Sequence, residues 1–116
     1  MNYKQIQQDY SKAFDALKKY SIKMWSASKF QITENIFSFF SGNSSEFEII
    51  ELRELYDFFD TNEIFILLTM YYNSEFSFDI VKDNVRIFES QIKYKTRTKA
   101  EEQGFLKCFE ILESNL

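Results

Sequence analysis

The chain has 116 residues, of which 45% are hydrophobic and 19% aromatic, and its formal net charge is −4. This length predicts one domain over residues 1–116, and the composition excludes a disordered chain. The sequence contains no histidine and one cysteine, so it lacks the commonest general base, the commonest metal ligand and the usual zinc sites. Because no glycine-rich phosphate-binding motif is present either, we predict a protein that is not an enzyme, with no catalytic residue, no metal site and no cofactor.

Targeting signals are also absent from the sequence. No N-terminal stretch has the basic start, the apolar run and the small-residue cleavage site of a secretory signal. The longest apolar run, residues 64–68, is too short to cross a bilayer. These features predict a cytoplasmic protein that does not contact a membrane.

The first predicted element is a helix over residues 2–24. Asn2 has the side chain of an N-cap, and apolar or small residues then recur at steps of three and four, as on one helix face. The residues of this stripe are Ile6, Tyr10, Ala13, Phe14, Leu17, Ser21 and Met24.

Two further helices are predicted before the middle of the chain. Residues 29–40 contain six large apolar side chains and precede a Ser/Gly/Asn-rich loop, which favours a short helix there. Ser45 and Glu48 have the spacing of a capping box, in which each side chain accepts a hydrogen bond from a free backbone amide of the first helical turn. We therefore predict a helix over residues 46–59.

The apolar period changes after residue 63. Residues 63–72 are apolar on both parities, residues 75–82 alternate, and residues 85–95 alternate with a change of parity that a one-residue bulge near Glu89 to Gln91 would explain. The turn signals between them predict a three-stranded antiparallel meander.

A final helix is predicted over residues 98–113, opened by a capping box from Thr98 to Glu101. Its apolar stripe includes Phe105 and Cys108, and Cys108 is expected to be a small buried side chain. Gly104 costs helix stability, which predicts a close approach of this helix to the sheet. The elements together predict an α+β fold.

Acidic residues concentrate in one part of the chain. Residues 31–63 carry eight acids against the single base Arg53. Three of the acids, Glu48, Glu51 and Glu54, step by three along the predicted helix. The pattern favours either an ordinary solvated helix face or a surface that binds a basic partner protein. The candidate partner-binding residues are Glu46, Glu48, Glu51, Glu54, Asp57, Asp60 and Glu63. A divalent-ion site at Asp57, Asp60 and Glu63 is a weaker hypothesis, since their spacing matches no known loop.

The basic counterpart is an alternating run, Lys93, Lys95, Arg97 and Lys99, with no acid between Gln91 and Ala100. In a strand these side chains would share one face. Such a face fits either protection of a sheet edge against aggregation or contact with the phosphates of a nucleic acid.

The predicted ending, three strands and a helix, resembles the second half of a double-stranded-RNA-binding domain over residues 75–112. In that family a Ser-Lys-Lys-x-Ala-Lys junction opens the last helix, and here Thr96-Arg97-Thr98-Lys99-Ala100 takes its place. Thr98 and Glu101 stand where the family has bases. The resemblance implies the topology and, as an alternative function, RNA binding through the basic run.

The ending Tyr94-Lys-Thr-Arg-Thr-Lys-Ala-Glu101, with Phe109-Glu-Ile-Leu112 after it, is also similar to small proteins of phages and mobile elements in AT-rich bacteria. Proteins of this kind include anti-CRISPR inhibitors, toxin-neutralising partners and immunity proteins, and inhibition of a type VI RNA-targeting effector is the most specific function that this resemblance implies. We therefore expect a non-catalytic inhibitor, monomeric or homodimeric, with a larger nucleic-acid-handling protein as its partner.

Overall fold

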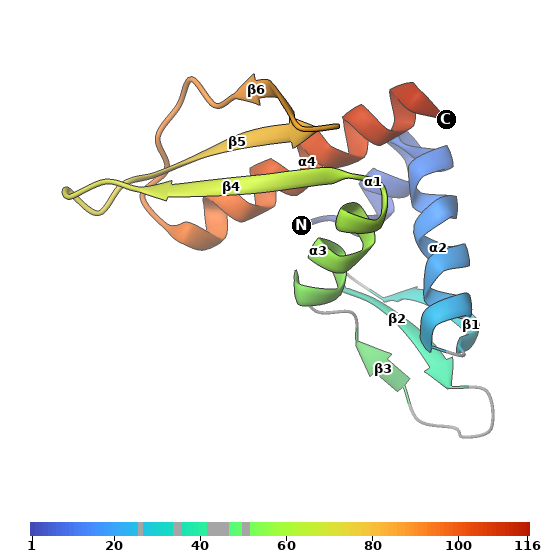
Figure 1. Ribbon diagram of the computed structural model, residues 1–116. Helices are drawn as coiled ribbons and strands as arrows, with labels where there is room; N and C mark the ends of the chain where they lie inside the picture. The colour runs from blue at the N-terminus through green and yellow to red at the C-terminus, as the bar shows by residue number, and fades with distance from the viewer. Residues whose placement is uncertain (26, 34–35, 42–46, 50–51) are drawn as a thin grey trace.

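The computed structural model describes residues 1–25, 27–33, 36–41, 47–49 and 52–116. Four helices and two three-stranded antiparallel sheets form these parts of the chain, in the strand orders β1-β2-β3 and β4-β5-β6 (Figure 1). The arrangement is the predicted α+β fold.

The predicted first helix is present as two consecutive helices, α1 (Tyr3–Asp9) and α2 (Ser11–Trp25). Asn2 caps α1 as expected, because its side chain accepts a hydrogen bond from the backbone amide of Gln5 at 3.1 Å. The interruption falls at Tyr10. The free backbone amide of Ala13 donates a hydrogen bond of 2.8 Å to the carboxylate of Glu113 in the last helix. The predicted stripe is buried at Ile6, Ala13, Phe14, Leu17 and Ser21, whereas Met24 at its end is exposed.

The helix predicted over residues 29–40 is wrong. This segment forms β1 (Ala27–Thr33) and β2 (Ile36–Ser41), which pair antiparallel from Thr33 opposite Ile36 outward. The segment is rich in Phe and Ile, which favour strands because their bulky side chains pack well on a pleated surface. A short apolar run fits both periods, so the choice between helix and strand rests on residue type and on pairing partners rather than on spacing.

The helix predicted over residues 46–59 is wrong in its first part. Glu48 lies in a third strand, β3 (Phe47–Ile49), directly opposite Phe39 of β2, so it cannot close a capping box. Ser45 and Glu46 lie outside the described residues. The helix that follows, α3 (Leu52–Thr61), starts after this strand and ends two residues beyond the predicted limit.

The meander is confirmed as β4 (Ile64–Met70), β5 (Phe76–Lys82) and β6 (Val85–Glu89). Asp83 and Asn84 both have positive φ, as in the tight turns that join two strands of a hairpin. The bulge is present, but it falls at Ile87, because Val81 pairs with Arg86 while Ile80 pairs with Phe88. It therefore lies closer to the turn than the predicted position near Glu89 to Gln91.

The third strand is shorter than the prediction of residues 85–95. After Glu89 the chain leaves the sheet, and it returns at Tyr94, which exchanges backbone hydrogen bonds of 2.6 and 2.7 Å with Phe76. The last helix, α4 (Arg97–Asn115), then begins at Thr96, whose hydroxyl accepts the amide of Lys99 at 3.1 Å. Thr96 rather than Thr98 is the N-cap, so the predicted capping box is wrong by two residues.

The core joins one face of the β4-β5-β6 sheet to α4, which lies on that face, and also includes buried residues of α1, α2 and α3 (Figure 1). Gly104 allows the expected close approach, since a Cβ built there would lie 3.3 Å from the side chain of Ile66. Phe59 of α3 and the α4 residues Phe105 and Phe109 form an aromatic cluster beside this contact. Cys108 is fully buried, as predicted, and burial raises the pKa of its thiol. None of the helices in the described parts of the chain has the length and apolar content needed to cross a membrane.

Candidate functional site: an acidic helix end and a basic helix start

Four of the seven candidate acids lie together on α3 and just after it. Glu54 is half-buried in the first turn, Asp57 and Asp60 are exposed farther along, and Glu63 follows the helix at a positive φ of 58°. We call these four residues the acidic surface. Asp83, in the turn between β5 and β6, adds a fifth carboxylate at this end, because its amide donates to the carbonyl of Glu63 at 3.4 Å.

The remaining candidate acids do not extend this surface along one helix. Glu46 and Glu51 lie outside the described residues, and Glu48 belongs to β3. The predicted stripe of Glu48, Glu51 and Glu54 on a single helix is therefore wrong.

The electrostatic setting of the acidic surface is unfavourable within the chain. The carbonyl end of a helix carries a partial negative charge, and Asp57 and Asp60 lie in the half of α3 that leads to it. Among the residues that the structure describes, no cation forms an ion pair with Asp57, Asp60 or Glu63. Most acids on α2, β5, β6 and α4, by contrast, have such partners, including Asp15, Asp79, Glu89, Glu101, Glu102 and Glu110.

The carboxyl of Asp60 has a shifted pKa. Partial burial, and then the negative charge of Asp57, raise the pKa of the Asp60 carboxyl above its ordinary value. The folded state thus binds a proton at Asp60 more readily than the unfolded chain does. The contribution of this group to stability increases as the pH falls through the folded pKa, and at neutral pH its charge destabilises the fold.

Replacement of Asp60 by asparagine is expected to raise the free energy of unfolding at neutral pH by about 0.3–1 kcal/mol, because the unfavourable charge near the helix end is removed. The difference between the variant and the wild type should disappear as the pH falls toward the acid range where Asp60 is protonated. Urea denaturation at several pH values measures both. A variant that is less stable than the wild type at neutral pH would contradict the unfavourable setting of this carboxylate.

Asp57, Asp60 and Glu63 do not come together as a set of metal ligands in the structure. In the portion of the chain that is described, no three or more Cys, Asp or Glu side chains come together in a way that could hold a metal ion. The hypothesis of a divalent-ion site at Asp57, Asp60 and Glu63 is therefore wrong.

The candidate bases gather at the start of α4 rather than along a strand. Lys93 and Lys95 flank Tyr94, which pairs with β5, while Arg97 and Lys99 belong to the first turn of α4. We call Lys93, Lys95, Arg97 and Lys99 the basic junction. The predicted alternation on one strand face is wrong, because β6 ends at Glu89 before the run begins.

The members of the basic junction differ in their partners. The ammonium of Lys93 lies 4.2 Å from the ring centroid of Tyr71, and Arg97 forms an ion pair with Glu101 at 3.3 Å. Lys95 and Lys99 are exposed and form no ion pair with a described residue. The amide end of a helix carries a partial positive charge, so Lys99 in the first turn is also in an unfavourable position.

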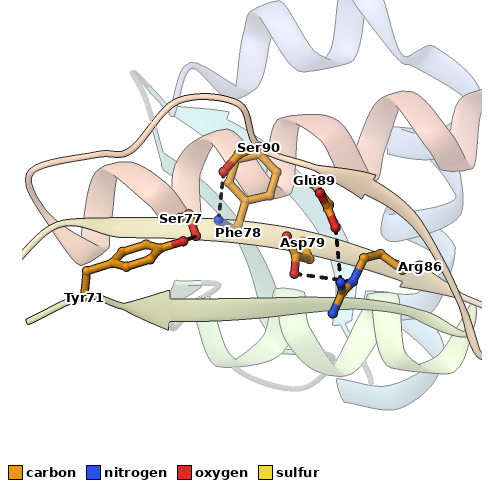
Figure 2. A network of polar contacts seen from close by, with 7 residues as sticks. All are labelled: Tyr71, Ser77, Phe78, Asp79, Arg86, Glu89 and Ser90. Carbon is orange, nitrogen blue, oxygen red and sulfur yellow. Dashed lines mark hydrogen bonds and ion pairs between the residues drawn. The ribbon is translucent and has the colours of Figure 1, made fainter.

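The β4-β5-β6 sheet turns its second face away from α4, and this face was not identified from the sequence (Figure 2). Arg86 of β6 bridges Asp79 of β5 at 3.5 Å and Glu89 at 3.1 Å, and the hydroxyl of Tyr71 contacts that of Ser77 at 3.1 Å. The β4 side of the same face is apolar, with Phe65 and Leu67 exposed. Every second residue of a strand shares a face, so the sequence indicates which residues lie together. Because β4 is apolar at both odd and even positions, the sequence did not indicate that one of its faces is exposed.

A shallow open depression lies near the end of β4. Leu68, Met70, Phe76 and Arg97 line it, and its volume is about 270 Å³. Its lining is apolar apart from Arg97, and it contains no pair of side chains suited to acid–base or nucleophilic chemistry.

Comparisons of the chain with protein-family models, with curated protein sequences and with solved structures found no match.

Proposed function

We propose that this protein is a non-catalytic binding protein that inhibits or neutralises a larger partner with a basic surface, of the type found on proteins that handle nucleic acid. The acidic surface supplies the contact. The observation that carries the proposal is that Asp57 and Asp60 lie exposed and without a cation partner among the described residues, near the helix end that disfavours negative charge. A basic side chain from a partner would relieve this arrangement and stabilise the complex.

The class of partner follows from the sequence resemblance together with this charge. Small proteins of phages and mobile elements with a similar ending include anti-CRISPR inhibitors, antitoxins and immunity proteins, and several of these classes act on nucleic-acid-handling enzymes. Such enzymes carry basic surfaces that hold phosphates, and a surface of carboxylates competes for them. Within this class, a type VI RNA-targeting effector remains the most specific candidate.

The test is capture of a partner from the native host by immobilised protein. We expect the wild type to retain a basic protein that elutes as the salt concentration rises. A variant with Asp57→Lys and Asp60→Lys should lose it. The matched control carries Asp15→Lys and Glu110→Lys, which produce the same change of net charge on exposed residues of α2 and α4. Equal capture by both variants would refute a role for the acidic surface.

RNA binding by the basic junction is the second candidate. The observation in its favour is that Lys95 and Lys99 are exposed at the amide end of α4, where their charges and the helix dipole together attract anions. If this function holds, the chain binds duplex RNA with an affinity that falls steeply with salt, and Lys95→Glu with Lys99→Glu removes the binding. Absence of RNA binding by the wild type at low salt would exclude it.

A further inference from the structure

Strand β4 lies at an edge of its sheet. It pairs with β5 on one side, and on the other side it pairs with no strand of the described residues (Figure 1). Its sequence, Ile-Phe-Ile-Leu-Leu-Thr-Met, contains no charged residue and no proline. Uncharged, regular edge strands of this length readily pair with another strand, and monomeric proteins usually protect them.

The backbone groups at this edge can be assigned from the pairing with β5. In antiparallel strands the residues alternate between those that bond to the partner strand and those that point away. The amide of Tyr71 donates to Glu75 and the carbonyl of Glu63 accepts from Asp83, so the odd-numbered residues of β4 bond toward β5. The amides and carbonyls that point outward are those of the even-numbered residues, and of these Ile66, Leu68 and Met70 are accessible, whereas Ile64 is fully buried where α3 contacts β4.

The opposite edge of the same sheet is protected. Strand β6 carries the charged residues Arg86 and Glu89, and the bulge at Ile87 interrupts its regular pairing. Charges and bulges are the devices that prevent the addition of a further strand. The sheet thus has one closed edge, and its β4 edge is open from Ile66 to Met70.

The open edge also runs from an acidic end to a basic end. Asp60 and Glu63 precede β4, whereas at its other end Lys93 lies over the ring of Tyr71 and Arg97 lies beside Met70 in the depression. An antiparallel partner with the same distribution of charge would set acid against base at both ends. A second copy of this chain has that distribution by definition, and a two-fold axis repeats each contact.

We propose that two copies of the chain associate through β4, which pairs antiparallel with β4 of the second copy around Leu67 to form one continuous six-stranded sheet. In this register Ile66 bonds to Leu68 of the second copy and Leu68 bonds to Ile66 of that copy, so the accessible outward backbone groups at the centre of the edge are matched, whereas the buried Ile64 takes no part. Leu67 faces Leu67 of the second copy at the two-fold axis, on the face of the sheet that points away from α4. Glu63 lies opposite Tyr71 of the second copy, beside the ammonium of Lys93 of that copy. This inference goes beyond the proposed function and does not depend on it.

The register is tested by cysteine cross-linking. Residues facing each other in a non-hydrogen-bonded antiparallel pair have Cα atoms about 4.5 Å apart, within the range that a disulfide spans. A Leu67→Cys variant should therefore form a disulfide-linked dimer on mild oxidation, and the native Cys108 is buried and does not interfere. In a Thr69→Cys control the two sulfurs would be separated by about four residues of strand, roughly 13 Å, and should not link.

Charge exchange tests the complementarity of the two ends. The Glu63→Lys and Lys93→Glu variants should each weaken association on the order of tenfold, because the contact occurs twice in the dimer and like charges then face each other. The double variant should regain most of the affinity. Leu67→Lys places two ammonium groups at the axis and should weaken association by about a hundredfold or more, whereas Val85→Lys, on β6, should not.

Sedimentation equilibrium of the purified chain gives these affinities in the absence of any other protein. A wild type that remains monomeric overturns the proposal, as does a dimer that Leu67→Lys leaves intact or a double variant weaker than both single ones. Binding instead of a strand from another protein would appear as capture that Leu67→Lys abolishes while the wild type itself is monomeric, and it would also overturn the proposal. Because none of these measurements uses the partner of the acidic surface, failure here leaves the proposed function to be judged by its own test.

Discussion

Replacement of Phe59 by alanine is expected to lower the free energy of unfolding by about 3–5 kcal/mol. The Phe59 side chain is 1% exposed, and its ring centroid lies 5.0 Å from that of Phe58, 6.0 Å from that of Phe105 and 5.0 Å from that of Phe109. It therefore joins α3 to α4 in the centre of the core. Its removal leaves a cavity, because rings held by two helices and a sheet cannot close the space.

Urea denaturation followed by circular dichroism measures this loss. Domains of this size have a total stability of about 5–15 kcal/mol, so the substitution should remove a large share of it. Tyr72→Ala is the control, since Tyr72 is fully exposed and its removal should change stability by less than about 0.5 kcal/mol. A loss below about 1 kcal/mol for Phe59→Ala would mean that α3 does not pack on α4 as described.

The second large effect is expected at Glu101, a buried acid on the first turns of α4. Its carboxylate accepts the hydroxyl of Tyr56 at 3.0 Å and pairs with Arg97 at 3.3 Å. Burial, the hydrogen bond to Glu101 and the Glu101 charge all raise the pKa of the Tyr56 hydroxyl, which keeps it a donor. Glu101→Ala should lower stability by about 2 kcal/mol, because a partly buried hydroxyl is left without a partner and α3 loses its polar link to α4.

A double-mutant cycle separates this link from other consequences of the substitution. Tyr56→Phe alone removes the donor, and the double variant removes both groups, so a direct interaction should give a coupling energy of about 1 kcal/mol. Glu110→Ala is the matched control, since Glu110 is an exposed acid of the same helix that pairs with Lys107 at 3.1 Å, and such pairs contribute little. Additive effects of the two substitutions would show that Tyr56 and Glu101 stabilise the protein independently.

The sequence was sufficient for the elements whose apolar period is long and regular. The stripe from Ile6 to Ser21, the meander over β4, β5 and β6, and the α4 contact at Gly104 are all present as predicted. These elements bury one face each, and the burial imposes the pattern that makes them recognisable.

The β1-β2-β3 sheet was missed for a physical reason. Residues 29–40 have a short apolar pattern that fits a helix and a strand alike. The choice is decided by pairing, within the segment from Thr33 opposite Ile36 outward and beyond it where Phe39 pairs with Glu48. Sequence spacing carries no information on such pairing. The same error produced the false stripe of Glu48, Glu51 and Glu54.

For the candidate site, the sequence predicted which residues take part but not how they are arranged. The composition identified Asp57, Asp60 and Glu63 on one side and the four bases of the basic junction on the other. It did not indicate that the two groups lie at opposite ends of β4, because that arrangement depends on the return of the chain to β5 at Tyr94. The open edge of β4 was hidden for a similar reason, since an apolar strand covered on both faces and an apolar strand at an edge have the same pattern.

Amide hydrogen exchange of the protein, alone and in complex with its captured partner, tests the central claim most directly. We expect the backbone amides of residues 52–63, which carry the acidic surface, to exchange more slowly in the complex, while those of residues 93–99 are unchanged. Protection of residues 93–99 with residues 52–63 unchanged would contradict it and would assign partner binding to the basic junction.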